Sequence, residues 1–348
     1  MPSYRFSLES PTTEVLLGDD LPPRMREAGN RVVVFDANTA RLFGEGVPDP
    51  VLLEDRDEAK TWSAVERVLL AALERGMDRG GEVLAVGGGA VCDVAGFAAS
   101  IYLRGVRLTL VPTTVTAMVD AALGGKTGIN LRQGKNLVGT FYPAHTLVVV
   151  PWVASRLPAA DYLDGLAEVI KTALLGDAEL LRLLERRREA VLAREPELVR
   201  EFVSRCIAVK ARFVAHDLRE ERGAEPGPDG TSRAFLNLGH TFAHALESAS
   251  EFAWTHGAAV AWGMGRALRL GLRLGLTDAT YAARVERLLR AYGYRLSAPE
   301  VTPESLLAAM RADKKRSGSE LRFVLQHDLE RTELRAVAPR EVLAVLAD

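Results

Sequence analysis

Three of the chain's six histidines lie in one short stretch, residues 237–257. His240 and His244 are four positions apart with no intervening Pro or Gly, so a helix would place them on one face, with Glu247 about one turn further along. Zinc prefers imidazole nitrogen and carboxylate oxygen when cysteine is absent, and a catalytic zinc needs only three protein ligands and one open position. Because a histidine pair at helical spacing is often structural, this stretch alone leaves both interpretations open.

Lysine is rare in this chain. Only seven of the 44 basic residues are lysines, and the rest are arginines. A lysine in such a composition suggests a position where a compact ammonium with three donors cannot be replaced by a planar guanidinium. Lys126, Lys135 and Lys171 all fall inside the motifs considered below, whereas chance retention would scatter lysines over the surface.

The first glycine-rich motif follows a predicted strand. Residues 82–86 form an apolar run that leads into Gly87, Gly88 and Gly89, and a helical pattern follows. Backbone N–H groups of such a turn, together with the helix N-terminus, can bind a phosphate. The alternative is a tight turn without a ligand, and the G-x-G-x-x-G fingerprint is absent. Asp93, in the first turn of the helix, could accept hydrogen bonds from a ligand.

A second motif contains Asp120, residues 124–130 (GGKTGIN) and residues 134–136 (GKN). Thr127 after Gly-Gly-Lys resembles the end of a P-loop, but the first glycine of that motif would have to be residue 120, which is Asp. We therefore expect two lysines on turns flanked by glycine, an arrangement that suits a small anionic substrate better than a nucleoside triphosphate.

The predicted elements divide the chain into two domains. Apolar runs at 31–36, 51–54, 82–86, 107–111 and 147–150 predict strands, and helical patterns at 58–77 and 90–102 separate some of them. In the first helix we expect Trp62, Val65, Leu69 and Leu73 on the inner face. Beyond Pro158 period-3.6 patterns dominate. We predict a Rossmann-like α/β parallel-sheet domain over 1–157 and a mostly α-helical domain over 158–348.

Composition indicates an ordinary globular chain. Its 348 residues carry a net charge of −2, which gives no general attraction to nucleic acid or membrane. There is no signal-peptide pattern and no apolar run near the roughly 18 residues of a membrane span. We expect a cytoplasmic protein. Cys92 and Cys206 lie in apolar helical patterns and are expected to be buried thiols rather than a disulfide.

Taken in order, the motifs resemble the 3-dehydroquinate synthase family of the shikimate pathway over roughly residues 30–320. The matching segments are 87–93 (GGGAVCD), 102–105 (YLRG), 112–114 (PTT), 124–130 (GGKTGIN), 134–136 (GKN), 167–171 (AEVIK), 236–241 (LNLGHT), 256–257 (HG) and 313–315 (DKK). Each segment is a weak signal alone, and their common order makes the resemblance specific.

The resemblance implies a dehydroquinate synthase-like fold with an NAD-binding N-terminal domain, a metal-carrying C-terminal domain and catalysis in the cleft between them. It implies one divalent zinc or cobalt ion held by Glu168, His240 and His256, so that His244 becomes a polar group for the substrate and Glu247 a supporting residue. The implied substrate is 3-deoxy-D-arabino-heptulosonate 7-phosphate. A homodimer is implied as well.

Further residues take roles from the same resemblance. The implied catalytic residues are Asp120, Lys126, Lys171 and His244. The implied substrate ligands are Arg104, Lys135, Asn136, Lys210, Glu220, Arg233, Asn237, Lys314 and Lys315, with the choice between the last two left open. The implied NAD-binding residues are Asp36, Asp57, Lys60, Gly88, Gly89, Asp93, Thr113 and Thr114, where an acid such as Asp36 after a strand favours NAD over NADP.

The implied reaction is a carbon–oxygen lyase reaction with transient oxidation by NAD, phosphate elimination, reduction and intramolecular aldol closure. The chain departs from the family pattern in the loop 223–230 between Glu220 and Arg233, and in Asp57, where Glu is usual. Three alternatives remain: another sugar-phosphate cyclase of the valiolone or inosose type, a polyol or glycerol-phosphate dehydrogenase of the same fold, and a non-catalytic binding protein.

Overall fold

The computed structural model divides by its internal contacts into two compact units. Unit 1 comprises Met1–Tyr162 and Arg194–Arg219, and unit 2 comprises Leu163–Ala193 and Glu220–Asp348. The predicted boundary at 157/158 stays a prediction, and the contacts add that 194–219 packs with the first unit. The structure describes residues 3–6, 13–132, 134–215, 217–223, 225–227, 229–297, 300–314 and 321–347.

The described part of unit 1 is built on a seven-stranded sheet with the order β1-β2-β9-β6-β5-β3-β4. All neighbouring strands are parallel except β1 and β2. The central strands read as continuous Val, Leu and Ala runs because both faces of the sheet are covered. The strands are β1 (Ser3–Phe6), β2 (Thr13–Leu17), β3 (Arg31–Asp36), β4 (Val51–Leu53), β5 (Glu82–Gly87), β6 (Arg107–Pro112) and β9 (Thr146–Val149).

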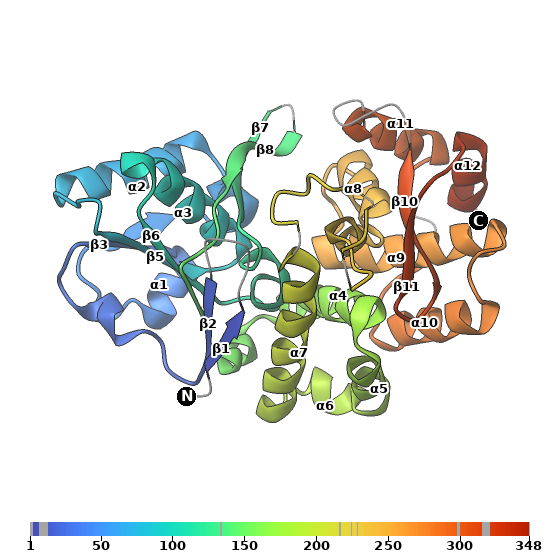
Figure 1. Ribbon diagram of the computed structural model, residues 1–348, viewed down its shortest axis with the longest axis horizontal. Helices are drawn as coiled ribbons and strands as arrows, with labels where there is room; N and C mark the ends of the chain where they lie inside the picture. Colours follow the sequence, from blue (N-terminus) through green and yellow to red (C-terminus); the bar gives the residue numbers. More distant parts are fainter. Residues whose placement is uncertain are drawn as a thin grey trace. The chain divides into compact units, whose positions relative to one another are not determined.

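Helices cover the two faces of this sheet. Helix α1 (Ala37–Phe43) lies on one face, and α2 (Trp62–Glu74) and α3 (Gly89–Ile101) lie on the other (Figure 1). From β3 the chain runs outward to β4 and then returns past β3 to β5, so the topological switch point lies between β3 and β5. Ligands of open α/β sheets bind outside the carboxyl ends of strands at such a point. The parallel-sheet prediction is confirmed.

A β-hairpin follows β6 in sequence. Strands β7 (Lys126–Leu131) and β8 (Gly134–Phe141) pair antiparallel, and β7 packs on α3. A Cβ on Gly96 of α3 would lie 2.5 Å from Thr127 Cγ2, which explains a glycine in that helix. The prediction that Lys126 and Lys135 lie on turns flanked by glycine is therefore wrong, because both lysines lie in strands of the hairpin.

Helix α7 (Pro196–Ala215) also belongs to unit 1. It packs on the 3₁₀ segment η5 (Pro151–Arg156) and on η4 (Ala117–Ala121), a π-helical turn that contains Asp120. Single π-turns are rare and often occur at functional sites. The other short 3₁₀ segments of this unit are η1 (Pro23–Arg26), η2 (Arg56–Ala59) and η3 (Tyr102–Arg104).

Unit 2 is mostly helical, as predicted, and it also contains a hairpin that the sequence patterns did not reveal. Helix α4 begins at the end of unit 1 and continues through unit 2. The helices are α4 (Ala159–Gly176), α5 (Ala178–Arg186), α6 (Arg188–Leu192), α8 (His240–Ala249), α9 (His256–Arg273), α10 (Ala279–Ala291), α11 (Pro303–Lys314) and α12 (Pro339–Ala347), with the 3₁₀ segment η6 (Arg233–Asn237). The hairpin consists of β10 (Arg322–Asp328) and β11 (Arg331–Ala336).

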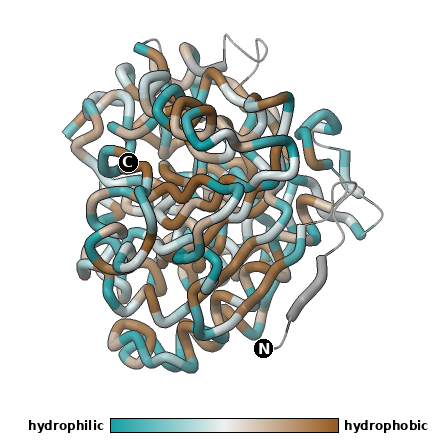
Figure 2. Tube along the Cα trace, turned by 90° about the vertical axis from the view of Figure 1, so that its left-hand side faces the viewer, coloured by the Kyte–Doolittle hydropathy of each residue, from teal (hydrophilic) through white to brown (hydrophobic). Residues whose placement is uncertain are grey.

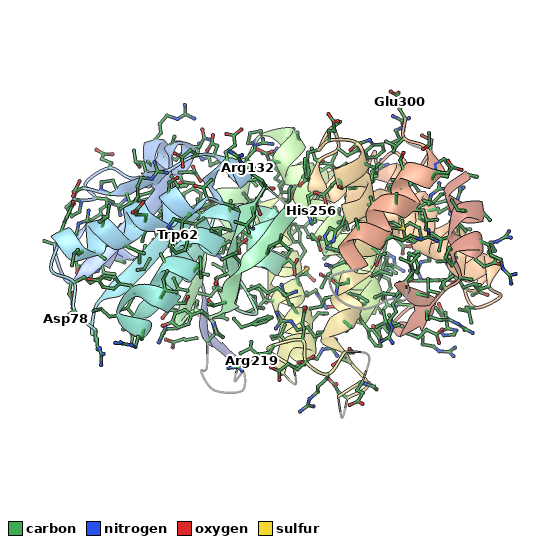
Figure 3. All side chains as sticks on the ribbon, turned by 90° about the horizontal axis from the view of Figure 1, so that it is seen from above. Trp62, Asp78, Arg132, Arg219, His256 and Glu300 are labelled. Carbon is green, nitrogen blue, oxygen red and sulfur yellow. The ribbon has the colours of Figure 1, made fainter. Side chains whose placement is uncertain are left out.

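Hydrophobic stretches recur along the trace between hydrophilic ones (Figure 2). The expected inner face of α2 is wrong in part. Trp62, labelled in Figure 3, is 54% exposed and Leu73 is 66% exposed, whereas Ala64, Val65, Val68 and Ala72 form the buried face. Cys92 and Cys206 are free and buried, as expected. Among the described residues, no helix is long and apolar enough to span a membrane.

Candidate active site

Three helices of unit 2 bring Glu168, His240 and His256 together. Glu168 lies on α4, His240 is the first residue of α8, and His256, labelled in Figure 3, is the first residue of α9. Their ligand atoms all lie within 4.8 Å of one another. His256 Nε2 is 3.2 Å and His240 Nε2 is 3.5 Å from the same oxygen, Glu168 Oε1. Two imidazoles and one carboxylate are a common ligand set for a catalytic zinc.

The second nitrogen of each imidazole faces an oxygen. His240 Nδ1 lies 3.2 Å from the carbonyl oxygen of Leu238. Because a carbonyl can only accept, Nδ1 donates the hydrogen bond, and the lone pair of Nε2 is available to a metal. His256 Nδ1 lies 3.5 Å from Glu247 Oε1. Metal-binding histidines usually have such an oxygen behind the ligating nitrogen, which fixes the ring and its tautomer.

The electrostatics of the group favour an ionised carboxylate. Burial alone would raise the pKa of Glu168, but the nearby Lys171 ammonium and the hydrogen bonds from the two histidines hold its pKa well below the usual range. Burial would lower the pKa of His256, yet its bonds to Glu168 and Glu247 raise that pKa to about 10. Burial, with the charge of Lys171, lowers the pKa of His240.

Glycines let the helices that carry His240 and His256 approach closely. Gly239 precedes His240 with φ +80°, and a Cβ there would lie 2.7 Å from the backbone nitrogen of Met264. Gly263 faces it from α9, where a Cβ would lie 2.2 Å from the Gly239 carbonyl oxygen. Helices α8 and α9 therefore meet backbone to backbone, and this contact fixes the position of His240 relative to His256.

Other sequence candidates lie in unit 2. Lys171, 2% exposed, lies one turn after Glu168, and its Nζ is 2.5 Å from Glu168 Oε2. The exposed His244 ring stacks edge-on with His240 at a centroid distance of 5.4 Å. Buried Arg233 donates from Nε to Glu220 Oε1 at 3.3 Å.

For the remaining candidates of unit 2, Asn237, Lys314 and Lys315, the structure gives at most a location in the fold. Asn237 is half-buried at the end of η6. Lys314 ends α11, but its side chain and the whole of Lys315 lie outside the described residues.

In unit 1 the structure joins predicted NAD residues to predicted substrate residues. Lys60 Nζ lies 2.5 Å from Asp93 Oδ2 and also donates to Asn136 Oδ1. Lys135 Nζ lies 2.5 Å from Asp57 Oδ2. Burial raises the pKa of Asp93, an effect that the Lys60 charge opposes. The β7–β8 hairpin is thus held to the segment around η2 by charge.

Lys210 and Asp120 form a second charged pair of unit 1. Buried Lys210 comes from α7, and its Nζ donates to the Asp120 backbone oxygen at 2.5 Å and contacts the Asp120 carboxylate. Both residues were candidates from the sequence, although 90 positions separate them. The π-helical turn of η4 and the position of α7 together bring them into contact.

The predicted NAD residues lie near the switch point. Asp36 ends β3, and Gly88 and Gly89 follow β5. The Asp36 carboxylate accepts from Thr39 N at 2.7 Å and so caps α1, which gives it a structural role beside any role in binding. Thr113 and Thr114 directly follow β6, the strand next to β5.

Three of the predicted substrate residues have strained backbones. Arg104, Asn136 and Glu220 have φ values of +69°, +55° and +57°, in a region that side chains other than glycine rarely adopt. Such strain often occurs at functional sites. Arg104 is exposed, as is Lys126.

The sequence patterns did not single out Asp164. This residue precedes Glu168 by four positions on α4, and it accepts a hydrogen bond from the backbone of Gly257, next to His256. The i, i+4 spacing of two acids on one helix was the available signal.

Comparison with known proteins identifies the family. Residues 50–164 match the family model "3-dehydroquinate synthase N-terminal", and residues 165–316 match "3-dehydroquinate synthase C-terminal". The chain is 35% identical to the 3-dehydroquinate synthase of Dehalococcoides mccartyi, with 93% of each chain covered. It is 39% identical to that of Solibacter usitatus, with 88% of this chain and 85% of the relative covered.

Among solved structures, the chain is similar to 2-epi-5-epi-valiolone synthase from Streptomyces hygroscopicus subsp. jinggangensis, which holds NAD+ and Zn2+. The TM-score is 0.86 and the sequence identity 27%, with 98% of this chain and 97% of that chain covered.

Proposed function

Because the chain belongs to the 3-dehydroquinate synthase family, we propose that it converts 3-deoxy-D-arabino-heptulosonate 7-phosphate to 3-dehydroquinate and phosphate. The observation that carries the proposal is the group Glu168, His240 and His256, with Glu168 and His240 buried, which lies inside the segment that matches the C-terminal family model. When bound, NAD supplies a reversible hydride acceptor, and a divalent zinc or cobalt ion supplies a Lewis acid.

The three ligand residues fit such an ion. Glu168 is fully buried with its pKa held well below the usual range, and both imidazoles direct Nε2 toward its carboxylate. Three protein ligands leave coordination positions for hydroxyl groups of a substrate. Nitrogen and carboxylate ligands suit zinc and cobalt alike, so we propose either ion. Lys171, paired with Glu168, and His244, stacked on His240, lie beside this group and are proposed as polar groups that orient the substrate.

Unit 1 contains the features that support NAD binding. The carboxyl ends of β3 and β5 flank the switch point, where Gly88 and Gly89 begin α3. Backbone N–H groups at that helix N-terminus suit a pyrophosphate. Asp36, at the end of β3, lies where a carboxylate can accept from ribose hydroxyls. Binding of NAD to this unit is supported by the fold and by the family.

Several cations support an anionic substrate. Lys126, Lys135, Lys210 and Arg233 are candidates for the phosphate and carboxylate groups. In the structure three of them pair with acids: Lys135 with Asp57, Lys210 with Asp120, and Arg233 with Glu220. A substrate anion can take the place of such a carboxylate at the cation, and the displaced carboxylate, which is partly exposed in each of the three pairs, would then be solvated by water.

The test is release of inorganic phosphate from the heptulosonate phosphate by purified protein, with trace NAD, with and without a chelator. Phosphate release that needs only catalytic NAD and stops on chelation is the expected result. The His240→Ala variant should release no phosphate and bind no zinc. An active, metal-free His240→Ala protein would show that the ligand assignment is wrong, and no release by the wild type with either metal would contradict the proposed function.

A second candidate is a sugar-phosphate cyclase that accepts a substrate without a carboxylate. The similarity to a valiolone synthase structure favours it, but the curated 3-dehydroquinate synthases share a higher identity with this chain. Parallel assays with sedoheptulose 7-phosphate, which lacks the carboxylate, distinguish the two. Preference for that sugar would replace the first proposal.

The proposal includes a cytoplasmic location and a homodimer. The family supports both, and the composition contains nothing that favours membrane or nucleic-acid binding. Sedimentation equilibrium should give twice the 37.8 kDa chain mass. A monomer at assay concentration would contradict the dimer while leaving the activity unaffected.

A further inference from the structure

The N-terminus of α9, which begins with the ligand His256, is capped by a different helix. The N-cap residue Thr255 makes no side-chain capping bond with the residues that the structure describes. Instead, Gly257 N donates to Asp164 Oδ1 at 2.7 Å, and Asp164 lies on α4, 93 positions earlier. A carboxylate at a helix N-terminus satisfies a free N–H group and interacts favourably with the helix dipole.

The backbones of α4 and α9 approach each other closely at this point. A Cβ on Gly257 would lie 1.9 Å from the backbone oxygen of Asp164 and 2.8 Å from its Cα. The two backbones therefore touch, and only glycine fits between them. The Asp164 side chain adds a directional bond to this contact, which fixes how far α9 is shifted along α4.

The same face of α4 holds the metal ligand. Glu168 follows Asp164 by four residues, so both carboxylates point from one side of the helix. Asp164 holds the backbone of α9 at Gly257, and Glu168 Oε1 lies 3.2 Å from the ring of the adjacent His256. A shift of α9 by a fraction of a turn would separate these two ligand atoms while each helix stayed intact.

We propose that Asp164 is a positioning residue for the metal centre: its bond to Gly257 N sets the register between α4 and α9, and thereby the distance between Glu168 and His256. The inference rests on the proposed metal-binding function of that group. It goes beyond capping, because a cap from any residue would stabilise α9, whereas only a cap from α4 fixes α9 relative to Glu168.

Capping of α9 alone and positioning of α9 against α4 predict different effects on metal binding. Residues behind metal ligands typically change metal affinity by about 10–100-fold when they are removed. Asp164→Ala should weaken cobalt and zinc binding by about that factor and change the visible absorption of bound Co2+, which reports ligand geometry. Asp164→Asn keeps an acceptor oxygen and should bind within about threefold of the wild type, with an unchanged spectrum.

A double variant separates register from capping. In Asp164→Ala/Thr255→Asp the exposed N-cap position gains its own acceptor, so α9 is capped again but is no longer tied to α4. We expect this variant to recover thermal stability without recovering metal affinity. The matched control is Asp278→Ala. It removes the N-cap of α10, whose Oδ1 accepts from Tyr281 N at 2.7 Å, and it should leave the cobalt spectrum unchanged.

The experiment titrates chelator-stripped proteins with Co2+ and measures zinc affinity by competition with a chromophoric chelator. Three outcomes would each overturn the inference. The double variant could regain the full metal affinity, or Asp164→Ala could bind metal as tightly as the wild type. The third is a loss of metal affinity in Asp278→Ala equal to that in Asp164→Ala. Wild-type protein that binds neither ion would overturn the metal site itself, and the proposed function with it, so the two failures are distinguishable.

Discussion

Glu247 illustrates how a residue outside the ligand set can shape the site. It lies on α8, three residues beyond His244, and is buried with Oε1 3.5 Å from His256 Nδ1. The initial helical pattern grouped Glu247 with His240 and His244, but its carboxylate faces the ring of a histidine on another helix. A carboxylate there fixes the His256 tautomer and increases the basicity of Nε2.

We therefore expect Glu247→Gln to weaken zinc affinity by about 10–100-fold while the protein stays folded. The measurement is competition with a chromophoric chelator. The chain offers a matched control in Glu333→Gln, since Glu333 Oε2 pairs with His327 Nε2 at 3.0 Å in the β10–β11 hairpin. Equal zinc affinity in both variants would mean that Glu247 does not support the ligand.

Lys126 is the residue that best tests the substrate assignments. It is exposed at the start of β7, so it contributes little core volume. If it binds a substrate anion, Lys126→Ala should lower kcat/KM at least about 100-fold, in line with the loss of a charged bond worth roughly 3 kcal/mol. The melting temperature should stay within about two degrees. Arg132→Ala, at an exposed site of the same hairpin, should keep activity; an active Lys126→Ala enzyme would remove Lys126 from the site.

At the scale of elements, the contact between α8 and α9 depends on the lack of a side chain at Gly263. Two glycines of α9 differ sharply in their surroundings. A Cβ at Gly263 would lie 2.2 Å from a backbone oxygen, whereas at Gly265 its nearest neighbour would be a Leu296 methyl group at 3.5 Å. Both positions are helical, so the gain in helix propensity on substitution by alanine is the same.

This difference predicts opposite effects on stability. Gly263→Ala should destabilise the protein by about 1–3 kcal/mol or more, since backbone must move to relieve the overlap. Gly265→Ala should be neutral or stabilising by up to about 1 kcal/mol. Urea denaturation of the two variants measures this directly. Similar midpoints for both would show that α8 and α9 can separate without cost.

A charged contact ties the 3₁₀ segment η1 to two central strands of unit 1. Glu82, at the start of β5, accepts from Arg24 Nε and Nη2 at 3.2 Å each and from Thr109 Oγ1 at 2.6 Å. Burial alone would raise the pKa of Glu82, but these bonds and the Arg31 charge lower it below its ordinary value of 4.5. The contact therefore links η1, β5 and β6.

A lowered carboxyl pKa stabilises the fold above the unfolded value, and this contribution is lost as the pH falls through the folded value. At pH 7 we expect Glu82→Gln to be less stable than the wild type by about 1–3 kcal/mol. The difference should shrink as the pH falls below 4.5. Denaturation midpoints at pH 7, and at about 5, 4 and 3.5, give the comparison. A constant difference across this range would mean that the charge of Glu82 does not contribute.

For the whole molecule, local sequence patterns predicted the order of strands and helices better than the buried face of a helix or the presence of a short hairpin. The parallel strands and the helical second half follow from hydrophobic period and length, which act locally. The exposed positions of Trp62 and Leu73 were missed because period alone does not show which side of a helix meets the sheet. The β10–β11 hairpin was missed because neither Arg322–Asp328 nor Arg331–Ala336 alternates apolar and polar residues, so both segments gave a weak strand signal within a helical region.

For the candidate site, too, local sequence patterns predicted the residues better than their contacts. The motifs and the family resemblance named Glu168, His240 and His256, and the structure brings their ligand atoms within 4.8 Å of one another. No local pattern could pair Lys210 with Asp120 or Asp164 with Gly257, because each pair joins elements about 90 positions apart. Contacts of this kind depend on how helices pack, which a sequence pattern does not contain.

Metal removal is the prediction that involves the whole chain. The three proposed ligands come from helices spread over residues 168–256, so an ion would close long loops between them and stabilise unit 2. A ligand at 100 times its Kd stabilises a protein by about 2.7 kcal/mol. At about 2–4 °C for each kcal/mol, chelation should abolish activity and lower the melting temperature by about 5–10 °C, and zinc should restore both.

The size of this shift is more informative than an absolute stability, because a chain with two compact units need not unfold in one step. His240→Ala is the control: its melting temperature should not respond to zinc, since one of the three ligands is gone and the ion would no longer close those loops. A zinc-dependent shift in His240→Ala equal to that of the wild type would place the stabilising ion elsewhere in the molecule. An unchanged melting temperature in both proteins, with activity lost on chelation, would mean that the ion acts in catalysis without holding unit 2 together.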